Sequence, residues 1–175
     1  MRHDTSDKTQ EQDVEETTDV FESLKADHRM VKEWFAKFEE ADKPTKSSIA
    51  EDTLAALEVH TAIEEELVYP AIAEVIDDED GIKEAIEEHH VAKLLIKELR
   101  RMKPGEDAFA TKFKVLGELV SHHIEEEEGE MFPQAEEAGI DTESLSRDVM
   151  KRKAALMRRH GGGKKSSAPR RRKAA

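Results

Sequence analysis

Apolar residues recur along this 175-residue chain at intervals of three and four, the spacing of helices that bury one stripe. Four long segments carry such a stripe, and turn-forming residues separate them at 42–45, 77–81 and 104–105. A shorter segment from about Asp141 continues the spacing near the C-terminal end. This pattern predicts an all-α fold: an up-down-up-down four-helix bundle with a short extra C-terminal helix.

A histidine interrupts the apolar stripe of each of the four long segments. These histidines are His28, His60, His89 and His123. In the second and fourth segments a glutamate follows the histidine by four residues, at Glu64 and Glu127. Positions four apart lie on one face of a helix, so each of these histidines and its glutamate are directed to the same side.

The two His-x-x-x-Glu phrases belong to a longer internal repeat. Each phrase ends in an aromatic residue followed by proline, at Pro70 and Pro133, where the helix is expected to kink one turn earlier. Each half of the chain therefore forms a helical hairpin that supplies two histidines and one glutamate. The sequence predicts a site where the two hairpins meet.

Four imidazoles and two carboxylates in one core need partners, because each unpaired buried polar group costs about 1–3 kcal/mol. A pair of metal ions would accept the imidazole lone pairs and neutralise the carboxylates. The chain has no cysteine, and imidazole with carboxylate suits iron, manganese or zinc rather than calcium or magnesium. Each ion would take two histidines, and both glutamates could bridge. The predicted metal ligands are His28, His60, Glu64, His89, His123 and Glu127.

The polar residues next to the predicted ligands are predicted to have other roles. Only one glutamate of each acidic run can follow the stripe, so Glu65, Glu66, Glu125 and Glu126 are predicted to lie on the surface. His90 and His122 lie one residue outside the stripe, and His122 is a candidate hydrogen-bond donor at the edge of the site. No catalytic residue is assigned. The alternative is a metal-free bundle whose polar stripe residues set the register of the helices.

The net charge of −13 is unevenly distributed. Residues 151–175 hold eleven Lys or Arg and no acid, which leaves 17 bases and 41 acids in the rest. We expect a disordered acidic tail at 1–18, the bundle at 19–158 and a flexible basic tail at 159–175. The acidic body should repel nucleic acid and anionic membranes, whereas the basic tail either makes weak, salt-dependent contacts with nucleic acid or only aids solubility. No apolar run has the length of a membrane span, and the N-terminus has no apolar signal-peptide core, so a cytoplasmic protein is expected. The sequence leaves open whether it is a monomer or a dimer.

The chain resembles the hemerythrin-like family, also called the HHE cation-binding domain. The resemblance covers roughly residues 19–158 and rests on the segments 27–29, 60–70, 88–90 and 123–133 in this order. It implies a four-helix bundle that holds two iron ions in a non-haem site, with manganese or zinc as alternatives. By position, the six predicted ligands above would be those of the family.

Members of that family carry or sense dioxygen, respond to iron, or act on peroxide and nitric oxide. Oxygen-carrying members have a further histidine one turn beyond the third-helix histidine, and this chain has Lys93 there. The resemblance therefore implies a symmetric four-histidine, two-glutamate site rather than an oxygen carrier. Two functional hypotheses follow: a di-iron protein that binds or reacts with dioxygen, peroxide or nitric oxide, or an iron- or oxygen-sensing or iron-storing module without turnover. Whether it is an enzyme stays open.

Overall fold

The computed structural model describes residues 19–161. The predicted acidic tail at 1–18 lies outside the described part, as do residues 162–175 of the predicted basic tail at 159–175, whereas residues 159–161 belong to the last helix. Within residues 19–161 the secondary structure is helical and contains no strand. The elements are α1 (Val20–Glu40), α2 (Lys43–Ile63), η1 (Glu64–Val68), α3 (Tyr69–Ala73), α4 (Glu79–Leu99), α5 (Asp107–Glu126), η2 (Glu127–Met131), α6 (Phe132–Glu137) and α7 (Thr142–Gly161).

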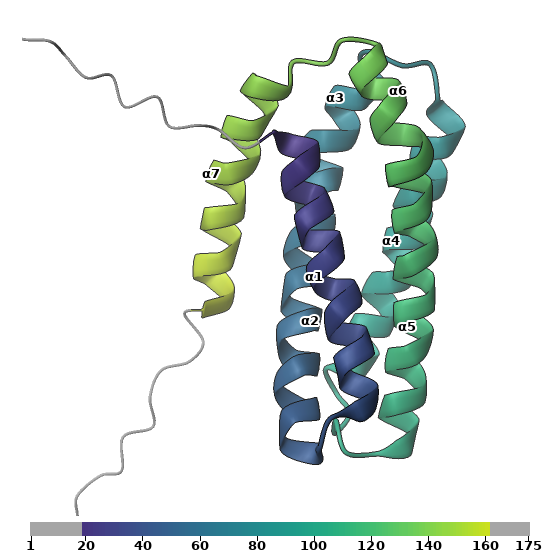
Figure 1. Ribbon diagram of the computed structural model, residues 1–175, viewed down its shortest axis with the longest axis vertical. Helices are drawn as coiled ribbons and strands as arrows, with labels where there is room; N and C mark the ends of the chain where they lie inside the picture. The colour runs from purple at the N-terminus through teal and green to yellow at the C-terminus, as the bar shows by residue number, and fades with distance from the viewer. Residues whose placement is uncertain (1–18, 162–175) are drawn as a thin grey trace, which may run out of the picture.

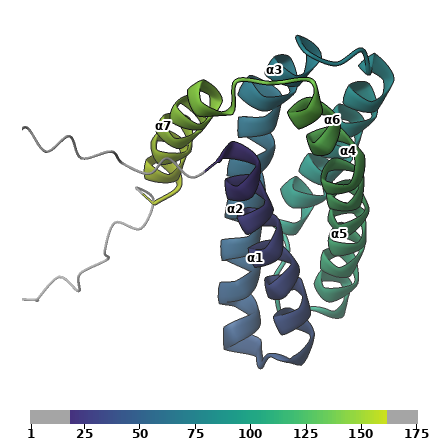
Figure 2. The same cartoon turned by 45° about the horizontal axis from the view of Figure 1, so that its top comes forward.

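The long helices form the predicted up-down-up-down bundle (Figure 1). Helix α1 packs beside α2 and α5, and α4 packs beside α5 and α2. Helix α7 lies outside the bundle against α1, α2 and η1 (Figure 2). Its inner face buries Leu145, Val149 and Leu156, as their spacing predicts, but its 20 residues make it as long as the bundle helices rather than short.

Aspartates at 19, 42, 78 and 141 precede four of the helices, and their side chains accept backbone hydrogen bonds from the first turn. Asp19 accepts from the N–H groups of Phe21 and Glu22, as the predicted start of α1 requires. Asp42 caps α2, so this helix begins at Lys43 rather than near Ser48. The expected break between the first two helices is present, but it covers only residues 41 and 42, because Pro44 lies in the first turn of α2, where the missing N–H costs nothing.

Helices α2 and α5 each pass into a π-helical turn directly at the glutamate of the repeated phrase. The carbonyl oxygen of Glu64 accepts from the N–H of Tyr69, five residues on, and that of Glu127 accepts from Phe132 in the same way. One aromatic residue separates each turn from a proline, which cannot donate to the carbonyl one turn earlier and would clash with it. The proline therefore produces a π turn, and the extra residue shifts the inward face downstream by one position.

This shift corrects the predicted inner face of the second segment. Regular α-helical spacing places Leu67 and Ala71 inward, but the structure only half buries both. Instead Val68, Tyr69 and Ile72 are buried, each exposing 1% or less of its surface. In η2 and α6 the corresponding residues are Met131, Phe132 and Ala135.

The apolar interior is divided into two clusters by a layer of polar side chains. One cluster, around Phe21, Ile72 and Phe132, fills the end nearest α7. The other, around Leu54, Phe109 and Phe113, fills the opposite end. The histidines lie at the boundary between the two clusters. None of the helices in the described part is both long and apolar enough to cross a membrane.

Candidate metal centre

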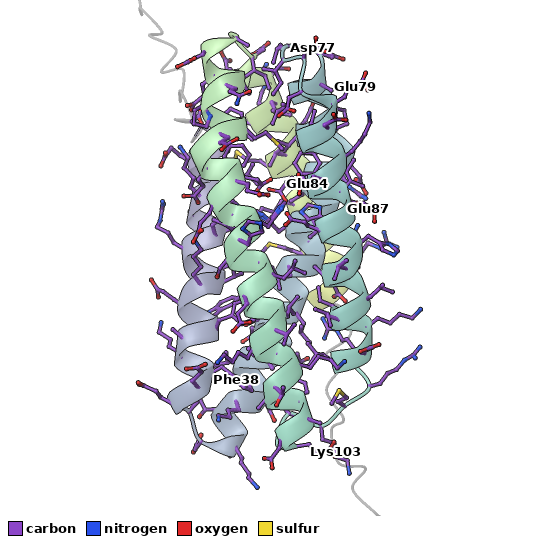
Figure 3. The ribbon with its side chains drawn as sticks, turned by 90° about the vertical axis from the view of Figure 1, so that its right-hand side faces the viewer. Phe38, Asp77, Glu79, Glu84, Glu87 and Lys103 are labelled. Atoms are coloured by element: carbon purple, nitrogen blue, oxygen red, sulfur yellow. The ribbon has the colours of Figure 1, made fainter. Side chains whose placement is uncertain are left out.

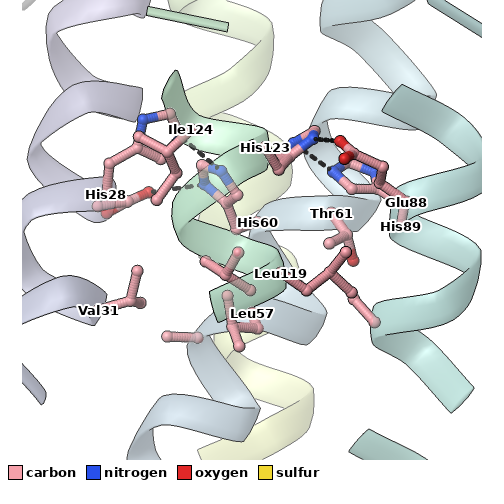
Figure 4. Close-up of a pocket in the computed structure, with 14 residues that line it drawn as sticks. His28, Val31, Leu57, His60, Thr61, Glu88, His89, Leu119, His123 and Ile124 are labelled. Carbon is pink, nitrogen blue, oxygen red and sulfur yellow. Dashed lines mark hydrogen bonds and ion pairs between the residues drawn. The ribbon is translucent and has the colours of Figure 1, made fainter. Parts of the chain in front are cut away.

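The six predicted ligands converge in the layer between the two apolar clusters. They come from six elements: α1, α2, η1, α4, α5 and η2. All are buried, and the two glutamates expose none of their surface. Figure 4 shows the imidazoles of the four long helices meeting above Leu57 and Leu119.

His28 and His60 form one pair of imidazoles with their Nε2 atoms 2.9 Å apart. Glu64 Oε1 lies 3.0 Å from Nε2 of His60, and Glu127 Oε2 lies 3.4 Å from Nε2 of His28. Two nitrogens about 2.1 Å from one ion are about 3 Å apart when they meet at a right angle. The separation of this pair is therefore that of neighbouring ligands around a transition metal.

His89 and His123 form the second pair, with their Nε2 atoms 3.0 Å apart. The other oxygen of Glu64, Oε2, lies 3.4 Å from Nε2 of His89. Glu127 Oε2 lies 3.4 Å from Nε2 of His123 as well as facing His28. Each glutamate thus faces both histidine pairs, and Glu64 presents a different oxygen to each.

Several buried polar atoms of this layer have no hydrogen-bond partner among the described residues. They are both carboxylate oxygens of Glu64 and Oε2 of Glu127, together with His60 Nδ1 and Thr61 Oγ1 nearby. A buried carboxylate without a partner is costly, so the oxygens call for a cation. Imidazole nitrogens and carboxylate oxygens at these separations fit a pair of transition-metal ions.

In the metal-free protein, protonated imidazoles balance the charge of the buried carboxylates. Burial by itself would lower the pKa of His28, but the Glu127 and Glu64 carboxylates outweigh burial and raise it to about 9. For His60, burial is likewise outweighed by Glu64, Asp27 and Glu127, and the pKa rises to about 10. Burial would raise the pKa of Glu64, yet the surrounding imidazoles hold it well below its ordinary value.

A second set of carboxylates faces the outer nitrogens of the four imidazoles. The Nδ1 atoms of His28, His89 and His123 lie at hydrogen-bond distance, between 2.7 and 3.1 Å, from carboxylate oxygens of Glu128, Glu65 and Glu88 respectively. His60 Nδ1 is 3.7 Å from Asp27, a charge contact without a hydrogen bond. An Nδ1–H that donates to a carboxylate leaves the Nε2 lone pair directed at the centre, as a metal ligand requires.

Each of these outer carboxylates is the sequence neighbour of a predicted ligand. Asp27 and Glu88 precede a ligand, whereas Glu65 and Glu128 follow one. Successive residues on a helix are about 100° apart around its axis. In a four-helix bundle, the neighbour of an inward-pointing residue therefore points toward the adjacent helix. The prediction of a surface position was wrong for Glu65, which is half-buried against His89. The Asp-His, Glu-His and Glu-Glu pairs are the signal that reveals these residues in the sequence.

Tyr69 is a site residue that regular α-helical spacing does not predict, because the π turn brings it inward. Its hydroxyl donates to Glu127 Oε1 at 2.9 Å and lies 3.3 and 3.4 Å from Nε2 of His89 and His123. Burial, together with the carboxylates of Glu64 and Glu127, raises its pKa well above the ordinary value. In the metal-free protein the phenol is therefore protonated and fixes one oxygen of Glu127.

The structure leaves the remaining candidates outside the centre. His90 and His122 are exposed, and His122 lies 3.2 Å from Glu126 on the surface. Lys93 turns outward and pairs with Glu65, the partner of His89. No fifth histidine joins the four imidazoles in the described part of the chain.

A small cavity of about 20 Å³ lies against the imidazole layer on the side away from Tyr69. Its walls are mainly apolar and include Val31, Leu57, Ala92 and Ile124 (Figure 4). A volume of about 10–15 Å³ is enough for one water molecule. The cavity can therefore hold one molecule of that size beside the histidines.

Comparison with known proteins gives the family. The chain is similar to a hemerythrin HHE cation-binding domain-containing protein from Mycobacterium kansasii, whose crystal structure superposes with a TM-score of 0.66. The two are 24% identical over 83% of this chain and 89% of the other, which supports the fold. No curated protein matches significantly. The family model described as Hemerythrin HHE cation binding domain matches residues 19–135, and the chain belongs to that family.

Proposed function

We propose that this protein holds two iron ions and binds or reacts with dioxygen, peroxide or nitric oxide. The observation that carries the proposal is the pairing of the histidines. Two imidazole pairs, with nitrogens 2.9 and 3.0 Å apart, are joined by Glu64, which offers one oxygen to each pair. The ligands would be His28 and His60 for one ion, His89 and His123 for the other, and Glu64 and Glu127 for both.

The donor set accommodates iron, manganese or zinc, so the choice of iron rests on the family. Six protein ligands do not fill two six-coordinate ions, and an iron pair would supply redox chemistry at the open positions. The protein's own contribution is to hold the imidazoles with outer carboxylates and to exclude water with the two apolar clusters.

The cavity beside the imidazoles favours a small and weakly polar ligand. Its apolar wall offers few hydrogen bonds, and its volume of about 20 Å³ excludes an organic substrate. Dioxygen and nitric oxide are small and weakly polar, so the cavity suits them better than peroxide, which needs hydrogen-bond partners. On the other side of the layer, Tyr69 keeps its proton and holds Glu127 in place.

Metal analysis of protein purified without chelator, together with the absorption spectrum, tests this proposal. We expect two iron ions per chain and an absorption band of the ferric pair. Peroxide added to this form then separates the two functional hypotheses. Sustained oxygen evolution over many turnovers supports catalysis, whereas one stoichiometric bleaching supports a sensing or storing module. A folded protein with no transition metal would contradict both.

Replacing a proposed ligand should lower metal content and stability together. We expect Glu127→Ala to lose at least one ion per chain and to lower the melting temperature of the loaded protein, because a bridging carboxylate is removed. Glu125→Ala is the matched control, since Glu125 is exposed two residues away in the same acidic run. Equal loss of metal in both variants would show that the assignment of the glutamates is wrong.

A further inference from the structure

An acidic vestibule opens beside the centre between the start of α4 and the η2 turn. This vestibule has a volume of about 110 Å³. Its outer wall carries the carboxylates of Asp78, Glu84, Glu126 and Glu130. Figure 3 shows Glu84 between α4 and the neighbouring helix, and Glu84 lines the same vestibule as His123.

The inner wall of the vestibule is formed by two proposed metal ligands, His123 and Glu127. Glu127 exposes none of its surface, and its Oε2 atom has no hydrogen-bond partner among the described residues. Glu127, at the inner end of the vestibule, therefore carries a buried carboxylate oxygen without a hydrogen-bond partner. The vestibule therefore ends against the centre, from which the fully buried side chain of Glu127 separates it.

The negative charge of the vestibule wall determines which ions and molecules it attracts. None of the lining residues is lysine or arginine, and the described part of the chain holds no ion pair for Glu84 or Glu130. Carboxylates that converge on a concave surface raise the local concentration of cations and speed their arrival. A neutral diatomic gains nothing from these charges, whereas a divalent cation does.

One vestibule residue, Glu126, also belongs to a neighbouring surface group that contains a nitrogen donor. Nε2 of His122 lies 3.2 Å from Glu126 and 4.0 Å from Glu88. The three residues offer ligand atoms within 4.8 Å of one another, a spacing that suits one metal ion. Glu88 also accepts from Nδ1 of His123, so a hydrogen bond joins this surface group to the buried centre.

We propose that the acidic vestibule is the route by which divalent metal ions enter the buried centre. The apolar cavity on the other face of the imidazole layer then serves the small neutral ligand, and the two species arrive from different sides. This inference rests on the proposed function, because it presumes that the centre binds metal.

The rate at which metal-free protein takes up Co²⁺ tests the route. Cobalt absorbs visible light when bound by imidazole and carboxylate, so stopped-flow absorbance gives the rate and titration gives the final stoichiometry. In low salt we expect Glu84→Gln combined with Glu130→Gln to slow uptake by about tenfold, with two ions per chain still bound at the end. The difference should shrink in high salt because the charges are screened.

The matched control is Glu39→Gln combined with Glu51→Gln, which removes the same charge from exposed positions at the opposite end of the bundle. Uptake by this control should match the unaltered protein. Equal rates in the two double variants would overturn the entry route. Failure of the unaltered protein to bind cobalt would instead contradict the metal centre, so the two failures are distinguishable.

Discussion

At the scale of single residues, each imidazole of the centre is held from two sides. Its Nε2 faces the other proposed ligands, and its Nδ1 faces a carboxylate carried by an adjacent helix. These carboxylates determine which ring nitrogen is unprotonated and available to a metal, and they fix the orientation of the ring. Their removal should weaken metal binding without removing a ligand.

We therefore predict that Glu88→Gln lowers metal affinity by about 10-fold or more, because His123 loses a carboxylate that orients and polarises it. Competition with a chelator of known affinity measures the change. Glu87→Gln is the control, since Glu87 is exposed on the preceding position of the same helix. An affinity for Glu88→Gln equal to that of the control would mean that the outer carboxylates do not support the centre.

At the scale of elements, the two π turns decide which residues follow the glutamates into the core. In η2 the extra residue carries Phe132 onto the inner face, where its ring lies 4.7 Å from that of Phe21. A regular α-helix in the same place would turn Phe132 away from the interior. The widened turn thus links the proposed ligand Glu127 to the packing of the apolar cluster nearest α7.

Deleting Gly129 should convert η2 toward α-helical spacing and rotate the residues after it by about 100°. We expect a loss of about 2 kcal/mol or more in the free energy of unfolding, since Phe132 leaves the core. Chemical denaturation measures the loss. Gly129→Ala is the control: the glycine has open space around it and no positive φ, so alanine should be neutral or stabilising. Unchanged stability after the deletion would show that the π turn is dispensable.

At the scale of the whole molecule, the buried layer balances its charges differently with and without metal. In the metal-free protein the balance falls to protonated imidazoles, since the pKa values of His28 and His60 rise to about 9 and 10. A histidine whose folded-state pKa is raised stabilises the fold fully below its ordinary pKa of about 6.5. That contribution is lost as the pH rises through the folded-state value.

The melting temperature of the chelator-treated protein should therefore fall between pH 7 and pH 10, whereas metal-loaded protein should lose metal on acidification as protons compete for the imidazoles. Circular dichroism melts across this range measure the first effect. His122→Gln is the control, because that imidazole is exposed and should leave the slope unchanged. A flat pH profile for the metal-free protein would contradict the proposed charge balance.

The sequence by itself determined the bundle, its topology and the convergence of six polar residues. The reason is periodicity: apolar spacing of three and four defines an inner face, and a histidine on that face must point inward wherever the helices pack. The inward positions of His28, His89 and His123 needed no tertiary information. Neither did the inner face of α7, which Leu145, Val149 and Leu156 define.

Only the tertiary structure decided which residues join the centre where the helices depart from regular α-helical spacing or meet their neighbours. Proline in each repeated phrase produces a π turn, and this turn, not the spacing, brings Tyr69 to the centre. The partners of the outer imidazole nitrogens depend on which helices are neighbours, so Glu65 moves from a predicted surface position to the side of His89. The acidic vestibule likewise combines residues from two ends of the chain's second hairpin, and no local pattern predicts that they meet.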